Sequence, residues 1–88
     1  MPLTLKIGDL AFYDSLTAGL VPCRVLEIKL GEFSAPYAKV QYTATRDWAK
    51  RGQVETWGTR RVVPRAAVRK FRGEYFPRIL PYTVEVDK

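Results

Sequence analysis

Apolar and polar positions along this chain alternate with the period of two that is typical of half-buried β-strands. The clearest example is the stretch from residue 38 to 45, in which Ala38, Val40, Tyr42 and Ala44 are separated by polar residues. Glycine, proline and other turn-forming residues separate this stretch from its neighbours. The pattern predicts short strands at residues 10–13, 20–30, 38–45, 54–57, 60–63 and 68–71.

The second predicted strand, residues 20–30, changes its phase along the way. Cys23 and Val25 fall on one face of an ideal strand, whereas Leu26 and Ile28 fall on the other. We expect either that both faces are covered or that a β-bulge near Val25 shifts the phase.

The connections between the strands carry their own signals. Residues 46–52 are polar and basic and end in glycine, so we expect a loop that projects from the sheet. Gly58-Thr59 lies between two predicted strands and favours a type II′ hairpin. Residues 64–67 are typical of a short 3₁₀ turn.

Five to six short antiparallel strands in a chain of 88 residues favour a mostly-β fold, and in particular a small barrel. A chain of this length builds one core, so we expect a single barrel domain at residues 1–72. Residues 73–88 form a C-terminal extension, in which residues 82–87 alternate again. That segment is expected to add an edge strand or to pair with a neighbouring chain.

Charge is distributed unevenly along the chain. The net charge is +6, from 15 Lys and Arg residues against nine Asp and Glu residues. Basic and acidic residues balance in residues 1–45, so the whole excess falls in residues 46–88. A polyanion is the natural partner of such a surface. No stretch approaches membrane-spanning length and the N-terminal residues lack a signal-peptide pattern, so we expect a cytoplasmic protein with no membrane partner.

The residues that carry chemistry in enzymes are sparse. The chain has no histidine, the commonest general base, and it has neither a glycine-rich phosphate loop nor metal-ligand spacing. Its only cysteine, Cys23, lies in an apolar strand and is predicted to be a small buried hydrophobe. The sequence therefore predicts a non-enzymatic protein without a cofactor or metal.

Several fragments carry a resemblance to known proteins. Residues 8–12, a glycine at position 19 and residues 23–28 are similar to the KOW pattern, with Cys23 where that pattern has glycine. Residues 10–14 and 62–68 are similar to the first strand and the last turn of SH3 domains. Over roughly residues 7–71 the chain thus resembles the SH3-like barrel superfamily, which includes KOW, Tudor and SH3 domains. The acidic loop and paired tryptophans that bind proline-rich peptides in SH3 domains are missing, so that activity is not implied.

The candidate site lies in the basic half of the chain. Arginine presents a planar fork of donors that fits phosphate, and an aromatic ring among arginines stacks on nucleic-acid bases. Trp48 lies in the polar loop and is predicted to be exposed, whereas Trp57 lies in a strand and is predicted to be more buried. We expect DNA or RNA to be bound by stacking on Trp48 and by phosphate contacts from Arg46, Lys50, Arg51, Arg60, Arg61 and Arg65.

Other interpretations of the same residues remain open. The basic residues are also compatible with a solvated surface or with the binding of an acidic protein surface. The strand-like ends, residues 3–7 and 82–86, also fit an assembly module that forms homo-oligomers by strand pairing.

A further interpretation concerns the tyrosines. Tyr13, Tyr37 and Tyr42, with a tryptophan and Asp47 or Glu55, have the composition of the aromatic cage with which Tudor domains hold methylated cations. Against a cage, Tyr42 lies on the apolar face of its strand and the basic surface repels a cation.

Overall fold

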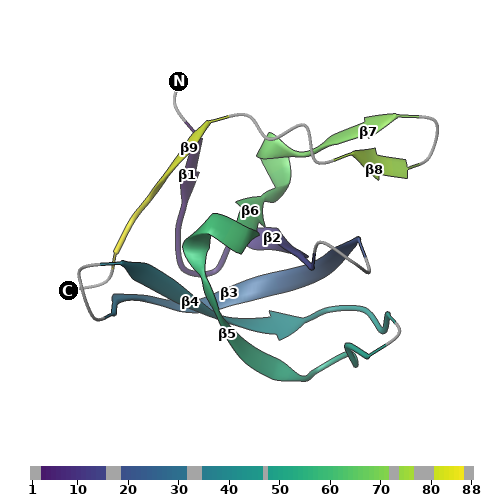
Figure 1. Ribbon diagram of the computed structural model, residues 1–88, viewed down its shortest axis with the longest axis horizontal. Helices are drawn as coiled ribbons and strands as arrows, with labels where there is room; N and C mark the ends of the chain where they lie inside the picture. The colour runs from purple at the N-terminus through teal and green to yellow at the C-terminus, as the bar shows by residue number, and fades with distance from the viewer. Residues whose placement is uncertain are drawn as a thin grey trace.

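A computed structural model describes residues 3–15, 19–31, 35–46, 48–71, 74–76 and 81–86. These residues are mostly in β-strands, with two 3₁₀ turns, which confirms the predicted mostly-β class and the turn near residues 64–67 (Figure 1). The strands are β1 (Leu3–Leu5), β2 (Leu10–Asp14), β3 (Leu20–Leu30), β4 (Pro36–Tyr42), β5 (Val54–Gly58), β6 (Val62–Pro64), β7 (Arg69–Phe71), β8 (Glu74–Phe76) and β9 (Tyr82–Val84), and the turns are η2 (Thr59–Arg61) and η3 (Arg65–Ala67).

Five of the strands form one antiparallel sheet in the order β5-β4-β3-β2-β6. The chain leaves β5 at one edge of this sheet, passes through η2, and enters β6 at the other edge (Figure 1). Within the described residues β5 and β6 are not paired with each other, so the hydrogen-bonded sheet is open rather than closed into a barrel.

The predicted hairpin at Gly58-Thr59 is wrong. Gly58 has φ −57° and ψ 140°, which is not the positive φ that the first position of a type II′ turn requires. Thr59 begins the 3₁₀ turn η2, and the strand after it pairs with β2 rather than with β5. In this position Val62 and Val63 are completely buried.

Of the two explanations that the sequence left open for β3, the structure shows the β-bulge. The register with β4 shifts between Val25 and Glu27. Because of that extra residue, Val25 and Ile28 both lie in the same buried cluster although three positions separate them.

Buried side chains form two clusters on opposite sides of β2. Successive residues of a strand point to opposite faces, so Ala11 and Tyr13 enter one cluster and Phe12 enters the other. We call the larger one the main core and the smaller one the second core. The main core contains Leu5, Ala11, Tyr13, Val21, Cys23, Val25, Ile28, Ala38, Val40, Tyr42, Ala49 and Val62, and the second core contains Phe12, Leu20, Val63, Ala67 and Val68.

The two ends of the chain are joined to each other. Strands β1 and β9 pair in parallel, and the hydroxyls of Thr4 and Thr83 lie 3.1 Å apart. The pair continues with a hydrogen bond from the Glu85 N–H to the Leu5 carbonyl at 2.9 Å. The strand expected in the C-terminal extension is therefore present, and it pairs within the chain. This pairing uses one edge of each terminal segment.

Strands β7 and β8 form a separate two-stranded sheet. The strand predicted at residues 68–71 thus exists as β7, but it pairs with β8 rather than with the main sheet. The boundary predicted between residues 72 and 73 lies outside the described residues. Across the part of the chain that the structure describes, no helix has the length and apolar character needed to cross a membrane.

Candidate nucleic-acid interface

The basic loop, which we define as residues 43–53, connects β4 to β5 and contains two tight turns. In the first turn the Arg46 N–H donates to the Ala49 carbonyl at 2.7 Å, and the Ala49 N–H donates back to the Arg46 carbonyl at 2.6 Å. The methyl group of Ala49 is fully buried in the main core. Trp48 is therefore carried by a turn that is fixed both by hydrogen bonds and by packing.

The second turn completes the loop. The Gln53 N–H donates to the Lys50 carbonyl at 3.0 Å, and the Gln53 side chain accepts from the Lys50 N–H at 3.3 Å. Gly52 adopts φ +88° and donates its N–H to the Tyr42 carbonyl at 2.8 Å. The Arg51 N–H donates to the Thr45 hydroxyl at 3.1 Å. The basic side chains thus project from a backbone that is already ordered.

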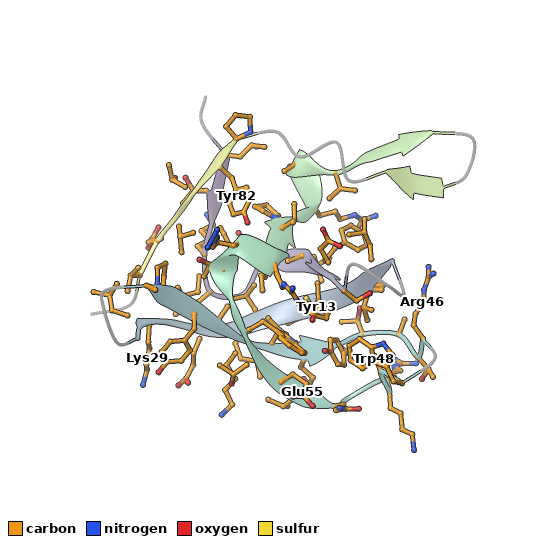
Figure 2. The ribbon with its side chains drawn as sticks, viewed as in Figure 1. Tyr13, Lys29, Arg46, Trp48, Glu55 and Tyr82 are labelled. Atoms are coloured by element: carbon orange, nitrogen blue, oxygen red, sulfur yellow. The ribbon has the colours of Figure 1, made fainter. Side chains whose placement is uncertain are left out.

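Trp48 rests on an aromatic cluster, which we define as Tyr13, Tyr42, Trp48 and Trp57 (Figure 2). The rings of Tyr13 and Trp57 stack with their centroids 4.1 Å apart, and the indole N–H of Trp57 donates to the Tyr42 hydroxyl at 3.0 Å. The Trp48 ring meets the Tyr13 and Tyr42 rings edge to face, each at 5.9 Å. Such offset and edge contacts are the preferred aromatic geometries, so the cluster is a well-packed platform.

The prediction for the two tryptophans is confirmed. Trp48 is 45% exposed, whereas Trp57 is half-buried and packs against the main core. Trp48 comes from the connection between β4 and β5, Trp57 comes from β5, and Tyr13 of β2 contacts both rings.

The cluster does not have the geometry of a cage for a cation. Tyr13 and Trp57 are in direct stacking contact, so no cation fits between these two rings. Tyr37 lies near the start of β4, opposite Gly58, whereas Tyr42 is the last residue of that strand. Asp47 lies outside the described residues. The rings that the sequence offered for a cage instead pack on one another.

Several basic residues lie on the same loop as Trp48 or contact the aromatic cluster from η2. Arg46, Lys50 and Arg51 are exposed on the basic loop that carries Trp48, and Figure 2 shows Arg46 and Trp48 at the same end of the molecule. Arg61 approaches from η2, where its guanidinium donates to the Tyr13 hydroxyl at 3.5 Å. One loop and one turn therefore bring four cations and one exposed indole to a common region.

Trp57 and Glu55 both affect the pKa of Tyr42 in the aromatic cluster. Burial raises the pKa of the Tyr42 hydroxyl, the hydrogen bond from Trp57 lowers that pKa, and the negative charge of Glu55 raises it further. Glu55 is half-buried and accepts a hydrogen bond from the Gln53 side chain at 2.6 Å. Tyr42 thus stays neutral at physiological pH.

The other two predicted phosphate contacts lie elsewhere. Arg60 is exposed on η2, and no described hydrogen bond ties it to the aromatic cluster. Arg65 lies on η3, where it lines a hollow with Leu10 and Phe12, on the side of β2 opposite to Tyr13. The structure therefore gathers Arg46, Trp48, Lys50, Arg51 and Arg61, and it places Arg65 apart from them.

Sequence reasoning did not find the role of Tyr13 as the link between Arg61 and the tryptophans. Tyr13 and Arg61 are 48 positions apart in the chain. Only the pairing of β2 with β6, in which Tyr13 lies opposite Val62, brings them together. The alternation of each strand taken alone contains no signal for that pairing.

The described residues contain no group of three or more His, Cys, Asp or Glu side chains that could hold a metal ion. Comparison with models of protein families, with curated proteins and with solved structures finds no match.

Proposed function

We propose that this chain is a non-enzymatic module that binds DNA or RNA through the basic loop, with Trp48 as a stacking platform for a base. The observation that carries the proposal is the placement of the exposed Trp48 ring on an aromatic cluster between Arg46, Lys50 and Arg51. Bases stack on aromatic rings while cations follow the phosphate backbone, which is the usual arrangement for single-stranded nucleic acid.

The architecture supports an SH3-like fold for this module. The main sheet has five antiparallel strands, its first strand, β2, pairs with its last strand, β6, and a 3₁₀ turn precedes that last strand. The fragments that resemble KOW and SH3 domains fall on β2, β3 and β6 within this sheet.

The basic loop is held in a fixed conformation, and this favours binding. Its two turns are closed by hydrogen bonds, and Ala49 anchors it in the main core. A ligand therefore meets side chains on a fixed backbone and loses less free energy to ordering than it would on a flexible loop. The carboxylate of Glu55 on β5 is already engaged with the Gln53 side chain.

The experiment is a fluorescence titration with mixed-sequence single-stranded oligonucleotides. We expect tryptophan emission to be quenched on binding, and Trp48→Ala to weaken the affinity by about tenfold, because a stacked base contributes about 1–3 kcal/mol. Tyr37→Phe, on a tyrosine outside the aromatic cluster, is the control and should leave the affinity unchanged.

Charge is tested with paired variants. Lys50→Gln removes a cation beside Trp48, and Lys39→Gln removes one from the exposed face of β4. We expect only the first to weaken binding. If the two variants weakened binding equally, the binding would depend on overall positive charge and not on the basic loop, which would contradict the proposal. Binding of an acidic peptide but of no oligonucleotide would replace the proposal by the protein-surface interpretation.

A further inference from the structure

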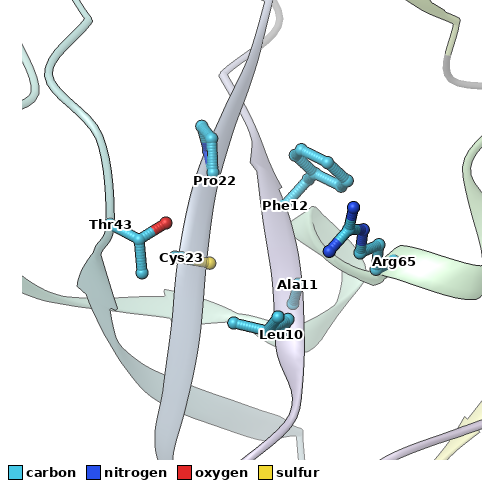
Figure 3. Close-up of a pocket in the computed structure, with 7 residues that line it drawn as sticks. All are labelled: Leu10, Ala11, Phe12, Pro22, Cys23, Thr43 and Arg65. Carbon is cyan, nitrogen blue, oxygen red and sulfur yellow. The ribbon is translucent and has the colours of Figure 1, made fainter. Parts of the chain in front are cut away.

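A hollow of about 190 Å³ lies on the side of β2 opposite to the aromatic cluster (Figure 3). Leu10 and Phe12 of β2 and Pro22 of β3 supply apolar walls, and Thr43 and Arg65 close it from two sides. These residues come from β2, β3, the start of the basic loop and η3, so the hollow is a feature of the tertiary fold. We call it the outer hollow.

A second hollow of about 250 Å³ adjoins the first and shares Leu10 and Arg65 with it. Leu3 and Pro64 add further apolar surface there, while Asp9 contributes a carboxylate. Leu10 is 41% exposed and borders both hollows. Its exposure follows from its position between the two hollows.

The polar groups differ between the two hollows in a way that selects a ligand. Arg65 is the only charged residue of the outer hollow, and within the described part of the chain no hydrogen bond or ion pair engages its guanidinium. In the second hollow Asp9 accepts a hydrogen bond from the Lys6 N–H at 3.1 Å and repels an anion. An anionic group is therefore directed to the outer hollow.

We propose that the outer hollow binds a small apolar carboxylate. The carboxylate accepts hydrogen bonds from the guanidinium of Arg65, whose planar fork matches two carboxylate oxygens. The apolar part of the ligand lies against Leu10 and Pro22. Because the volume is below the roughly 300–1,000 Å³ of sites for drug-sized ligands, the ligand is a short acid or a single ring. This site meets the basic loop at Thr43 but lies on the side of β2 opposite to the aromatic cluster, and it does not depend on nucleic-acid binding.

Nuclear magnetic resonance of the full, ¹⁵N-labelled chain tests this proposal. The probe is phenylacetate, and phenylacetamide is its neutral counterpart of the same shape. We expect phenylacetate to shift the amide signals of Leu10 and Phe12 and the Nε–H signal of Arg65. It should bind about fivefold more tightly than the amide, as expected for one charge-assisted contact at a solvent-accessible site.

Two variants of Arg65 distinguish the contribution of its positive charge from that of its planar guanidinium group. Arg65→Gln should abolish the preference for the acid, and Arg65→Lys should retain only part of it, because lysine keeps the charge but not the planar fork. Arg60→Gln removes a cation that lines neither hollow and should leave the preference intact.

Three results would overturn the proposal. They are equal affinity for the acid and the amide, the same loss of preference in Arg60→Gln as in Arg65→Gln, and shifts centred on Trp48 instead of Leu10. The absence of any shift up to about 10 mM ligand would do so as well. None of these readouts uses an oligonucleotide, so failure here leaves the proposed function of the basic loop intact.

Discussion

Consecutive residues of the basic loop have opposite environments. Ala49 is fully buried in the main core, while Trp48 directly before it is 45% exposed. The small side chain anchors the turn, and the large one lies over Tyr13 and Tyr42 with part of its ring in solvent. Anchoring by a neighbour allows a large aromatic side chain to remain accessible without leaving the loop unsupported.

In the basic loop, Gly52 has a backbone conformation that few other residues can adopt. Its φ of +88° is costly for other residues, although a Cβ added there meets no atom within 4 Å. We expect Gly52→Ala to lower the free energy of unfolding by about 1–2 kcal/mol through backbone strain alone. Gly58→Ala is the matched control, because Gly58 has φ −57° and equally open space. Urea unfolding of both variants measures the difference, and equal stabilities would contradict this explanation.

Cys23 provides a test of burial. Burial raises the pKa of its thiol from 9.0 to about 12, against a smaller lowering by the backbone of Tyr13. We expect the thiol of the folded protein to resist a disulfide reagent near pH 8 and to react quickly once urea unfolds the chain. Rapid reaction of the folded protein would contradict the buried position.

The same thiol makes stability depend on pH. Its pKa is higher in the folded chain than in the unfolded chain, so its contribution is complete below about pH 9 and is lost as the pH rises toward about 12. Urea unfolding near pH 8 and near pH 10 should show this loss. Cys23→Ala should remove part of the pH dependence, and the remainder belongs to tyrosines with raised pKa values such as Tyr42 and Tyr82.

At the scale of elements, β9 connects the end of the chain to the turn that carries Arg61. The Tyr82 hydroxyl donates to the Thr59 carbonyl at 2.6 Å, and the Thr59 hydroxyl donates to the Pro36 carbonyl at 3.5 Å. Tyr82 also packs against both cores. The short parallel pair of β1 and β9 is thereby fixed to the main sheet.

We expect Tyr82→Phe to lower the free energy of unfolding by about 1 kcal/mol, since it removes one hydrogen bond and leaves the Thr59 carbonyl without that donor. Tyr37→Phe is the control, because no described hydrogen bond involves the Tyr37 hydroxyl. Thermal unfolding of the two variants gives the comparison. A Tyr82→Phe protein as stable as the original would show that β9 is held by its backbone pairing alone.

Local pattern predicted the elements of this fold better than their partners. Alternation located the central strands and pointed to the irregularity near Val25. A strand that buries one face has apolar residues at every second position, so this signal lies within the strand's own sequence. The hairpin at Gly58 failed because a glycine between two strands does not reveal that β6 completes the other edge of the sheet. The parallel pair of β1 and β9 joins segments about 80 residues apart, and no short window of sequence contains that information.

The candidate site shows the same limit. The exposure of Trp48 followed from its polar neighbours, and the strand position of Trp57 indicated its burial. The separation of Arg65 from the other arginines did not follow, because Arg65 is only four positions beyond Arg61. The intervening strand β6 pairs alongside β2, so Arg61 and Arg65 lie at its two opposite ends, which no count of charges reveals.

For the whole molecule, the uneven charge distribution has a structural counterpart. The net charge of +6 arises entirely from residues 46–88, and the basic loop brings three of these cations to Trp48. Arg61 joins them through Tyr13. The molecule therefore presents about four cations at one region, a number that fixes how strongly binding should respond to salt.

The salt dependence of oligonucleotide binding is the most direct test of this account. With four phosphate contacts from Arg46, Lys50, Arg51 and Arg61, the logarithm of the association constant should fall against the logarithm of salt concentration with a slope of about −3 for single strands. The double variant Lys50→Gln, Arg51→Gln should reduce that slope to about −1.5. A slope near zero, or one that the double variant leaves unchanged, would contradict the claim that the basic loop binds nucleic acid.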